Sequence, residues 1–308
     1  MKIAWAGLLW GLAFVVLEAL QFVYFGGLFQ RMNSFQFGSL IFGIATVAFI
    51  AWSAFYRLPE LKRALAQPRL LIAINVTATF AWAAYLGAVQ LIEPAVAYTI
   101  GAGVMPLASL VAWRLGWPEA EGLTNPVQTI GVALIALGTL ALALILLTGN
   151  AGFTRGGFGT ALAGLALAIA DGVFFTWLLF LCGRLNDKGV GPGTVFGLRF
   201  PMYVVVSGLI FTAGYGGGEA LPNAELLWIT ALGLLLVVPP LYALQRAVAQ
   251  ISTLAISLLT AIGPFLIFAL QIVEGRVALS TATLAGLCLY FLGALVAAWG
   301  QGRSNSAT

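Results

Sequence analysis

Long runs of apolar residues, separated by short polar segments, dominate the chain. Ten of these runs are about 20 residues long, the length that an α-helix needs to cross the hydrocarbon core of a bilayer. They lack the alternation of barrel strands, and lipid leaves no backbone polar group unpaired. The pattern predicts an all-α membrane protein with ten transmembrane helices, near residues 3–28, 36–56, 70–91, 94–114, 127–148, 158–182, 195–214, 225–245, 251–273 and 281–300.

Composition strengthens this prediction, because 61% of the residues are hydrophobic and only 8% are charged. Ten spans of about 20 residues use about two thirds of the chain and leave only short connections. No room remains for a catalytic domain outside the membrane, so we expect the function to be carried out within the bilayer.

The charged loops predict the orientation of the chain. The side that carries both termini would hold these cations: Lys2, Arg57, Lys62, Arg63, Arg69, Arg114, Arg184, Lys188, Arg246 and Arg303. The other side would hold only Arg31, Arg155 and Arg276, while Arg199 falls within the seventh span. The positive-inside rule therefore places both termini in the cytoplasm. The net charge of +4 forms no continuous basic stretch with aromatic residues, so we expect no nucleic-acid partner.

Histidine is absent from the sequence. This excludes His-based triads, His proton relays and the common His-containing zinc sites. The two cysteines, Cys182 and Cys288, lie in apolar segments and are interpreted as small core residues rather than redox groups or ligands. We therefore expect no metal and no cofactor.

The two halves of the chain match each other when the second is laid on the first. The matched pairs include Pro106 with Pro264, Glu119 with Glu274, Gly131 with Gly286 and Gly138 with Gly293. Because each copy holds an odd number of spans, the second copy enters the membrane from the opposite side. The match predicts two inverted five-helix repeats, with chance identity among Ala, Leu and Gly as the alternative. The expected units are residues 1–149, a glycine-rich linker at 150–157, residues 158–302 and a flexible tail at 303–308.

Small residues lead to Pro106 and Pro264, a glutamate follows each proline, and a glycine pair lies in the last helix of each copy. This order resembles the drug/metabolite transporter superfamily in its two-copy, EamA-type form, over essentially the whole chain. Within the superfamily the sequence is most similar to bacterial exporters of aromatic amino acids. The resemblance implies a multi-pass protein of the bacterial inner (cytoplasmic) membrane, a monomer or weak dimer. It also implies a central cavity, lined by the first, third and fourth helices of each copy, and alternating access.

The first span carries polar and aromatic residues at helical spacing. Trp10, Phe14, Glu18 and Gln21 share one face. A charge facing lipid near the bilayer centre costs at least about 2.5 to 3.5 kcal/mol, so this face should point inward. Glu18 is then either a substrate or proton site, or a structural acid that is hydrogen-bonded to a neighbouring helix.

Asp171 lies near the middle of the sixth span, and the repeat aligns it with Phe14, while Phe175 aligns with Glu18. Each copy thus offers one acid and one aromatic ring at nearly the same place. Such a pair would hold the ammonium group and ring of an amino acid, or would carry protons. The alternative is a buried hydrogen bond from a backbone amide to Asp171, at a helix break next to Gly172.

Further candidates lie in the third and ninth spans. Asn75, Thr79 and Trp82 share one face, with Tyr85 at its margin, and Thr260 lies on a face of small hydroxyl groups. Such hydroxyls usually serve helix packing, but aromatic and amide groups opposite them would form an amphipathic pocket. Six aromatic side chains are candidate contacts for a ring of the solute: Trp10, Phe14, Trp82, Tyr85, Tyr98 and Tyr242. For each of these rings, core packing is the alternative.

Two further features concern the helices themselves. Pro239 and Pro240 delete two successive backbone donors, so we expect the eighth helix to be interrupted there, as a hinge or a half-helix. Arg199 and Arg246 lie near cytoplasmic ends and are expected to snorkel to the interface, or to meet a substrate carboxylate.

These patterns predict a secondary transporter that exports small amphipathic solutes, with aromatic amino acids as the expected substrates. The chain has no Walker loop, so ATP is not the direct driver. The alternatives are an exporter of drugs or other metabolites with the same fold, and an intramembrane enzyme. The enzyme alternative is weak. Without histidine the remaining acid route is a pair of aspartates, and only Asp171 is embedded in a span.

Overall fold

The computed structural model describes residues 5–29, 33–150, 156–215, 223–273 and 281–306. Within these ranges the chain is helical and contains ten helices long and apolar enough to cross a membrane, which confirms the predicted number of spans. Several expected features lie outside the described residues: Lys2, Arg31, Arg155, Glu274, Arg276, residues 151–155 of the linker and residues 307–308 of the tail.

Eight of the ten spans are single helices, and two are built from pairs of helices. The single helices are α1 (Trp5–Phe29), α2 (Ser34–Tyr56), α4 (Pro68–Leu91), α5 (Pro94–Arg114), α6 (Pro126–Leu147), α7 (Phe158–Asp187), α10 (Asn223–Val248) and α13 (Thr281–Ser306). The seventh span consists of α8 (Pro192–Leu198) and α9 (Pro201–Thr212), and the ninth of α11 (Thr253–Thr260) and α12 (Gly263–Val273). A short helix, α3 (Leu58–Leu65), lies between the second and third spans. Helix α13 reaches Ser306, within the segment expected as a tail.

Prolines break the spans at positions that differ from the expected one. The seventh span is interrupted before Pro201 and the ninth before Pro264. The expected interruption at Pro239 and Pro240 is wrong, because α10 continues through both prolines. Each proline removes only its own donor, and the rest of the hydrogen-bond ladder carries the helix on, as it also does around Pro106 in α5. A hinge movement at Pro239 and Pro240 stays a prediction.

Asn75 repairs the break in the seventh span. Its side-chain Nδ2 donates a hydrogen bond to the carbonyl oxygen of Leu198 at 2.8 Å, where α8 ends. Its Oδ1 accepts one from the backbone N–H of Met202 at 3.1 Å, where α9 begins. One amide thus satisfies a carbonyl and an N–H that the break leaves without helical partners.

Replacing Asn75 with alanine is expected to destabilise the fold by about 1 to 3 kcal/mol, because both backbone groups would lose their partner in an apolar setting. Asn186→Ala is a matched control, since the Asn186 amide has no hydrogen-bond partner among the described residues. Thermal unfolding of the detergent-solubilised variants measures both effects. Equal losses for the two variants would show that the bridge contributes nothing specific.

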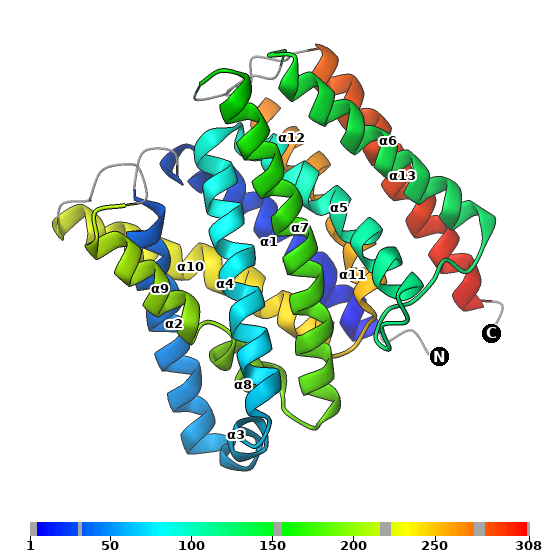
Figure 1. Ribbon diagram of the computed structural model, residues 1–308. Helices are drawn as coiled ribbons and strands as arrows, with labels where there is room; N and C mark the ends of the chain where they lie inside the picture. The colour runs from blue at the N-terminus through cyan, green and yellow to red at the C-terminus, as the bar shows by residue number, and fades with distance from the viewer. Residues whose placement is uncertain (1–4, 30–32, 151–155, 216–222, 274–280, 307–308) are drawn as a thin grey trace.

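The helices pack in pairs that combine segments far apart in sequence (Figure 1). Helix α4 packs along α7, α1 along α10, and α2 against α8 and α9. Helices α6 and α13 pack mainly against each other at one edge of the bundle. Glycines allow this close contact: a Cβ at Gly138 would lie 2.6 Å from the backbone nitrogen of Tyr290. Gly131 and Gly138 of α6 and Gly293 of α13 thus allow the two helix backbones to approach closely.

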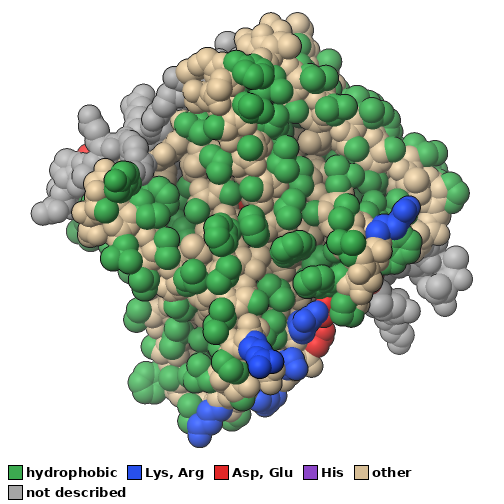
Figure 2. Space-filling view, viewed as in Figure 1, with side chains coloured by type: hydrophobic (Ala, Val, Ile, Leu, Met, Phe, Trp, Pro, Cys, Tyr) green, Lys and Arg blue, Asp and Glu red, His purple; other side chains and the backbone are tan. Residues whose placement is uncertain are grey.

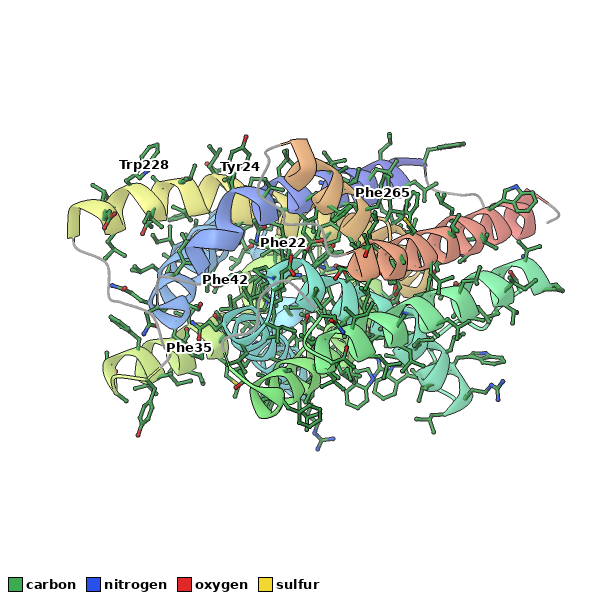
Figure 3. All side chains as sticks on the ribbon, turned by 90° about the horizontal axis from the view of Figure 1, so that it is seen from above. Phe22, Tyr24, Phe35, Phe42, Trp228 and Phe265 are labelled. Atoms are coloured by element: carbon green, nitrogen blue, oxygen red, sulfur yellow. The ribbon has the colours of Figure 1, made fainter. Side chains whose placement is uncertain are left out.

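Hydrophobic side chains cover much of the face of the bundle that Figure 2 shows. Figure 3 shows Trp228 at the outer edge and Phe22 and Phe42 among the helices, and Trp228 is 65% exposed. Lys and Arg side chains gather along the lower edge of Figure 2. The start of α1 and the end of α13 also lie toward the lower side of the bundle in Figure 1, which we call the termini side.

Candidate functional site

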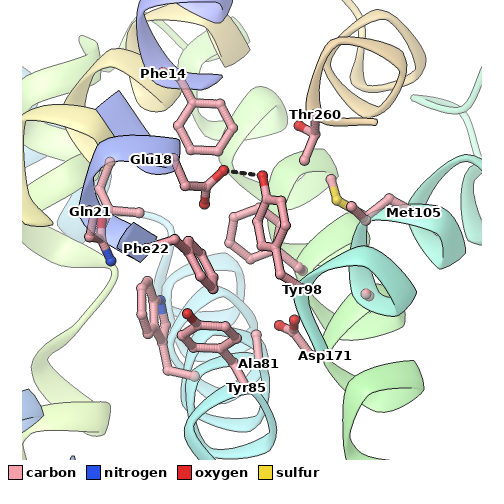
Figure 4. A pocket seen from close by; sticks show the side chains of 16 residues that line it. Phe14, Glu18, Gln21, Phe22, Ala81, Tyr85, Tyr98, Met105, Asp171 and Thr260 are labelled. Carbon is pink, nitrogen blue, oxygen red and sulfur yellow. Dashed lines mark hydrogen bonds between the residues drawn. The ribbon is translucent and has the colours of Figure 1, made fainter. Parts of the chain in front are cut away.

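A small cavity of about 40 Å³ lies in the middle of the bundle, and we call it the central cavity. Its walls come from α1, α4, α5, α7, α10 and α11. The lining residues are Phe14, Glu18, Gln21, Phe22, Ala81, Trp82, Tyr85, Tyr98, Gly101, Ala102, Met105, Asp171, Gly172, Phe175, Leu241 and Thr260. Two carboxyl groups and several aromatic rings thus meet inside an apolar bundle (Figure 4).

Helix α1 contributes the first acid. Phe14, Glu18 and Gln21 line the cavity, as the shared face predicts, and Phe14 is only 1% exposed. The Glu18 carboxylate accepts a short hydrogen bond from the hydroxyl of Tyr98 on α5. This bond joins α1 to α5, and both helices belong to the first half of the chain. A carboxylate held by a single donor keeps further lone pairs for a ligand.

Helix α7 contributes the second acid, Asp171. A Cβ at Gly101 of α5 would lie 2.9 Å from the Asp171 carboxylate oxygen, so the carboxylate fits against a bare stretch of α5. Helix α7 continues unbroken past Gly172, and Asp171 has no hydrogen-bond partner among the described residues. This contradicts the alternative of a backbone amide bonded to Asp171 at a helix break. The acid is therefore embedded without a neutralising partner in the described part of the chain.

Aromatic rings fill the space between the two acids (Figure 4). The ring centroids of Phe22 and Tyr98 are 4.5 Å apart, and those of Phe22 and Tyr85 are 5.7 Å apart. The Tyr85 hydroxyl and the Trp82 indole N–H are buried, with no partner among the described residues. Acids, rings and unpaired donors in one place suit a solute that has a cationic group on an aromatic body.

Four candidates from the sequence lie outside the central cavity. Asn75 bridges the α8 and α9 break, and the Thr79 hydroxyl donates to the Asn75 carbonyl at 2.7 Å. Trp10 and Tyr242 contact each other with centroids 6.3 Å apart, and the Arg246 guanidinium lies over the Trp10 ring at 5.0 Å. These four side chains therefore serve helix packing in this conformation. The other nine candidates, Phe14, Glu18, Gln21, Trp82, Tyr85, Tyr98, Asp171, Phe175 and Thr260, line the cavity.

The sequence reasoning missed several lining residues, and three of them carried a usable signal. Phe22 follows Glu18 by four residues and so belongs to the same face of α1. Gly101 and Gly172 lie where α5 and α7 touch, which small residues in membrane helices generally indicate. Met105 and Leu241 are apolar residues among many, and nothing in the sequence distinguished them.

A larger cavity of about 550 Å³ opens on the termini side, and we call it the vestibule. It is lined by residues of α1, α7, α10, α11 and α13 and of the loops after α5 and α10, including Leu8, Phe180, Gly183 and Val248. Along α7, Gly183 of the vestibule lies two helical turns from Phe175 of the central cavity. One buried apolar cluster contains lining residues of both cavities, Phe14 of the central cavity and Val248 of the vestibule among them.

Glu119 and Arg184 form an ion pair at the vestibule. Arg184 Nε and Nη2 donate to the two carboxylate oxygens of Glu119 at 2.5 and 2.7 Å. Through these bonds the guanidinium holds the pKa of the Glu119 carboxyl below its usual value. The pair joins the loop after α5 to the end of α7, and the Arg184 guanidinium also lies 5.7 Å from the centre of the Trp117 ring.

Because the pKa of Glu119 is lowered on folding, its contribution to stability is present at neutral pH and is lost as the pH falls through the folded-state pKa. We expect Glu119→Gln to lower stability at pH 7 by at most about 1 kcal/mol, since Arg184 is 37% exposed and screened by solvent. Thermal midpoints measured from pH 7 down to about pH 3 should converge for variant and wild type. Glu121→Gln is the control, because Glu121 forms no ion pair among the described residues; a pH-independent difference for Glu119→Gln would contradict the ion-pair origin.

Arg199 does not lie at the interface, as the sequence predicts, but inside the bundle. Its side chain is 1% exposed and does not snorkel to the interface. The break between α8 and α9 turns it into the bundle, where its guanidinium lies over the rings of Phe196 and Phe200. Cys182 is buried beside it, whereas Cys288 is exposed on α13, so the core interpretation is confirmed for Cys182 and wrong for Cys288.

The comparisons with known proteins bear on the fold. No family model matches this sequence, and no curated protein matches it either. A crystal structure of another protein superposes with a TM-score of 0.70, over 98% of this chain and 99% of the other, at 21% sequence identity. The two proteins therefore share a fold along their whole lengths, and this similarity says nothing further about the activity.

Proposed function

We propose that this chain is a secondary transporter of the two-copy, EamA-type drug/metabolite transporter superfamily. It exports small amphipathic solutes across the bacterial inner membrane by alternating access, and aromatic amino acids are the expected substrates. The observation that carries this proposal is the central cavity, where Glu18, Asp171 and a set of aromatic rings meet in the middle of an apolar bundle. Embedded acids are costly in a membrane and are rarely kept without a role in a solute or ion pathway.

The packing of the helices supports an inverted repeat. If the halves are exchanged, α1 corresponds to α7, α4 to α10, α5 to α11 with α12, and α6 to α13. Under this exchange the α4 and α7 contact becomes the α10 and α1 contact, and both are extensive. The contact of α5 with α7 likewise becomes that of α11 and α12 with α1, while the α6 and α13 contact maps onto itself. The sequence match and the packing thus favour the same two copies.

The size of the central cavity supports alternating access. A volume of about 40 Å³ holds a few water molecules at most, and an aromatic amino acid does not fit. It shares no lining residue with the vestibule, and lining residues of both belong to one buried apolar cluster. The two halves must therefore move apart before a solute reaches Glu18 and Asp171. The wide vestibule on the cation-rich side, which we assign to the cytoplasm, is the path by which the solute would enter.

A second candidate function within transport is the export of cationic drugs or other metabolites. The two acids among aromatic rings favour it, because this arrangement also attracts lipophilic cations. The intramembrane enzyme stays the weaker alternative, because aromatic rings lie between the described acids Glu18 and Asp171.

Counterflow in proteoliposomes tests the proposal. Vesicles that contain the purified protein and unlabelled tryptophan should accumulate labelled tryptophan, phenylalanine and tyrosine, and empty vesicles should not. Lipophilic cations should compete weakly. Strong competition by these cations, with no exchange of amino acids, would favour the drug exporter; no exchange of either class would contradict a transport function.

A further inference from the structure

Arg199 is the largest fully buried side chain in the described part of the protein. Its guanidinium carbon lies 4.9 Å from the centre of the Phe196 ring and 4.5 Å from that of Phe200. Its Nη1 donates a hydrogen bond to the side-chain oxygen of Gln245 on α10 at 3.1 Å. Two rings and one amide thus hold the guanidinium in place, and Cys182 lies beside it. We call these five residues, Arg199, Phe196, Phe200, Gln245 and Cys182, the cluster.

The positive charge of Arg199 has no counter-ion among the described residues. Its Nε and Nη2 are buried without a hydrogen-bond partner, and so is the Nε2 of Gln245. All three are donors and cannot satisfy one another. Leaving a buried charge unpaired is costly, so the cluster is suited to an acceptor that the chain itself does not supply.

Arg199 caps the C-terminal end of α8, and α9 begins two residues later at Pro201. The negative end of one helix dipole and the positive end of the next therefore meet beside the guanidinium and offset each other, so the helix ends do not balance its charge. A neutral acceptor would satisfy only the unpaired donors. An anion would satisfy the donors and also balance the positive charge, and a carboxylate would do so with bidentate geometry.

The cluster adjoins the walls of both cavities. Gly183 and Val248 line the vestibule, and each is one turn or less along its helix from a member of the cluster, Cys182 or Gln245. On the other side, the Phe200 ring that covers the guanidinium lies 6.4 Å from the ring of Trp82, which lines the central cavity. Arg199 therefore has neighbours in the walls of both cavities.

We infer that Arg199 and Gln245 form an anion-binding station that takes the carboxylate of the transported solute on its way from the vestibule to the central cavity. The inference rests on the proposed function and specifies its substrate class as carboxylate-bearing solutes. An amino acid carries its ammonium and carboxylate on one carbon, whereas the rings of Phe200 and Trp82 separate Arg199 from the central cavity. The solute therefore uses the anion-binding station and the central cavity in succession. Its carboxylate binds at Arg199 first, and its ammonium then reaches Glu18 and Asp171.

Tryptophan and tryptamine, which differ only in the carboxylate, test the inference in proteoliposomes. We expect Arg199→Gln to raise the half-saturating concentration of tryptophan by about ten- to a hundredfold and that of tryptamine by less than about threefold. Arg199→Lys should restore part of the loss, because it keeps the charge but not the planar fork. Arg114→Gln, an exposed arginine at the end of α5, is the matched control and should leave both solutes unchanged.

Alkylation of Cys182 by N-ethylmaleimide, in a Cys288→Ser background, gives a second readout that leaves Arg199 intact. Tryptophan should slow the labelling of Cys182, while tryptamine should not. Protection by chloride equal to that by tryptophan would assign the site to an inorganic anion and overturn the inference. An equal loss of tryptophan and tryptamine transport in Arg199→Gln would show a purely structural arginine and also overturn it. Failure of wild-type transport with intact Cys182 protection would refute the proposed function and leave the anion site standing.

Discussion

Asp171→Asn is expected to reduce the transport of ammonium-bearing solutes by about ten- to a hundredfold. The substitution keeps the size of the side chain and removes its charge, and a hydrogen bond to a charged group contributes roughly 1.5 to 3 kcal/mol. Asp171 forms no hydrogen bond among the described residues, so the substitution breaks none, and the asparagine keeps the packing against α5. The thermal stability of the variant should therefore equal or exceed that of the wild type, which separates a binding defect from a folding defect.

Initial rates of tryptophan counterflow measure this effect, and Glu225→Gln is a matched control because Glu225 is exposed near the start of α10, outside both cavities. The double variant Glu18→Gln with Asp171→Asn extends the test to energy coupling. If protons are carried by these acids, the double variant loses the dependence of flux on a pH gradient. A double variant with unchanged flux and unchanged pH response would remove both acids from the mechanism.

Gly172→Val is expected to destabilise the protein by about 1 to 3 kcal/mol or more and to abolish transport. A Cβ at Gly172 would lie 2.5 Å from the backbone oxygen of Gly101 and 2.8 Å from the Val104 side chain. The closest of these atoms belongs to backbone, so α5 has to move away from α7. That movement displaces Tyr98 and Asp171, which face the central cavity from these two helices.

Gly159→Val is the control for this substitution, because Gly159 lies on the same helix, outside both cavities, and a Cβ there would meet no atom within 4 Å. Thermal unfolding and counterflow on both variants are the measurements. Normal stability and transport in Gly172→Val would show that α5 and α7 do not depend on their close contact.

The sequence predicted the helical spans and the inward face of α1 because both follow from strong constraints. Lipid excludes charges and unpaired backbone groups. The length of an apolar run therefore predicts a span, and the position of an acid predicts which face of the helix points inward. Glu18 and Asp171 were found for this reason. Tyr98 was identified only as a ring, and its hydrogen bond to Glu18 depends on the packing of α5 against α1, which no local pattern reveals.

The role of Asn75 could not be predicted, because its partners, Leu198 and Met202, lie more than a hundred residues away in sequence. The location of the breaks was equally hidden. Pro239 and Pro240 remain within a helix, whereas Pro201 begins a new one, where Asn75 from α4 satisfies the freed backbone groups. Arg199 was misplaced for the same reason, since the break before Pro201 turns it inward.

A structure of the protein in lipid nanodiscs with bound tryptophan tests the central claim most directly. The account predicts a widened central cavity in which the ammonium of tryptophan contacts Glu18 or Asp171 and its indole packs among Phe22, Tyr85 and Tyr98. Tryptophan bound only outside the bundle, or a central cavity that stays at its present size while tryptophan binds elsewhere, would contradict it.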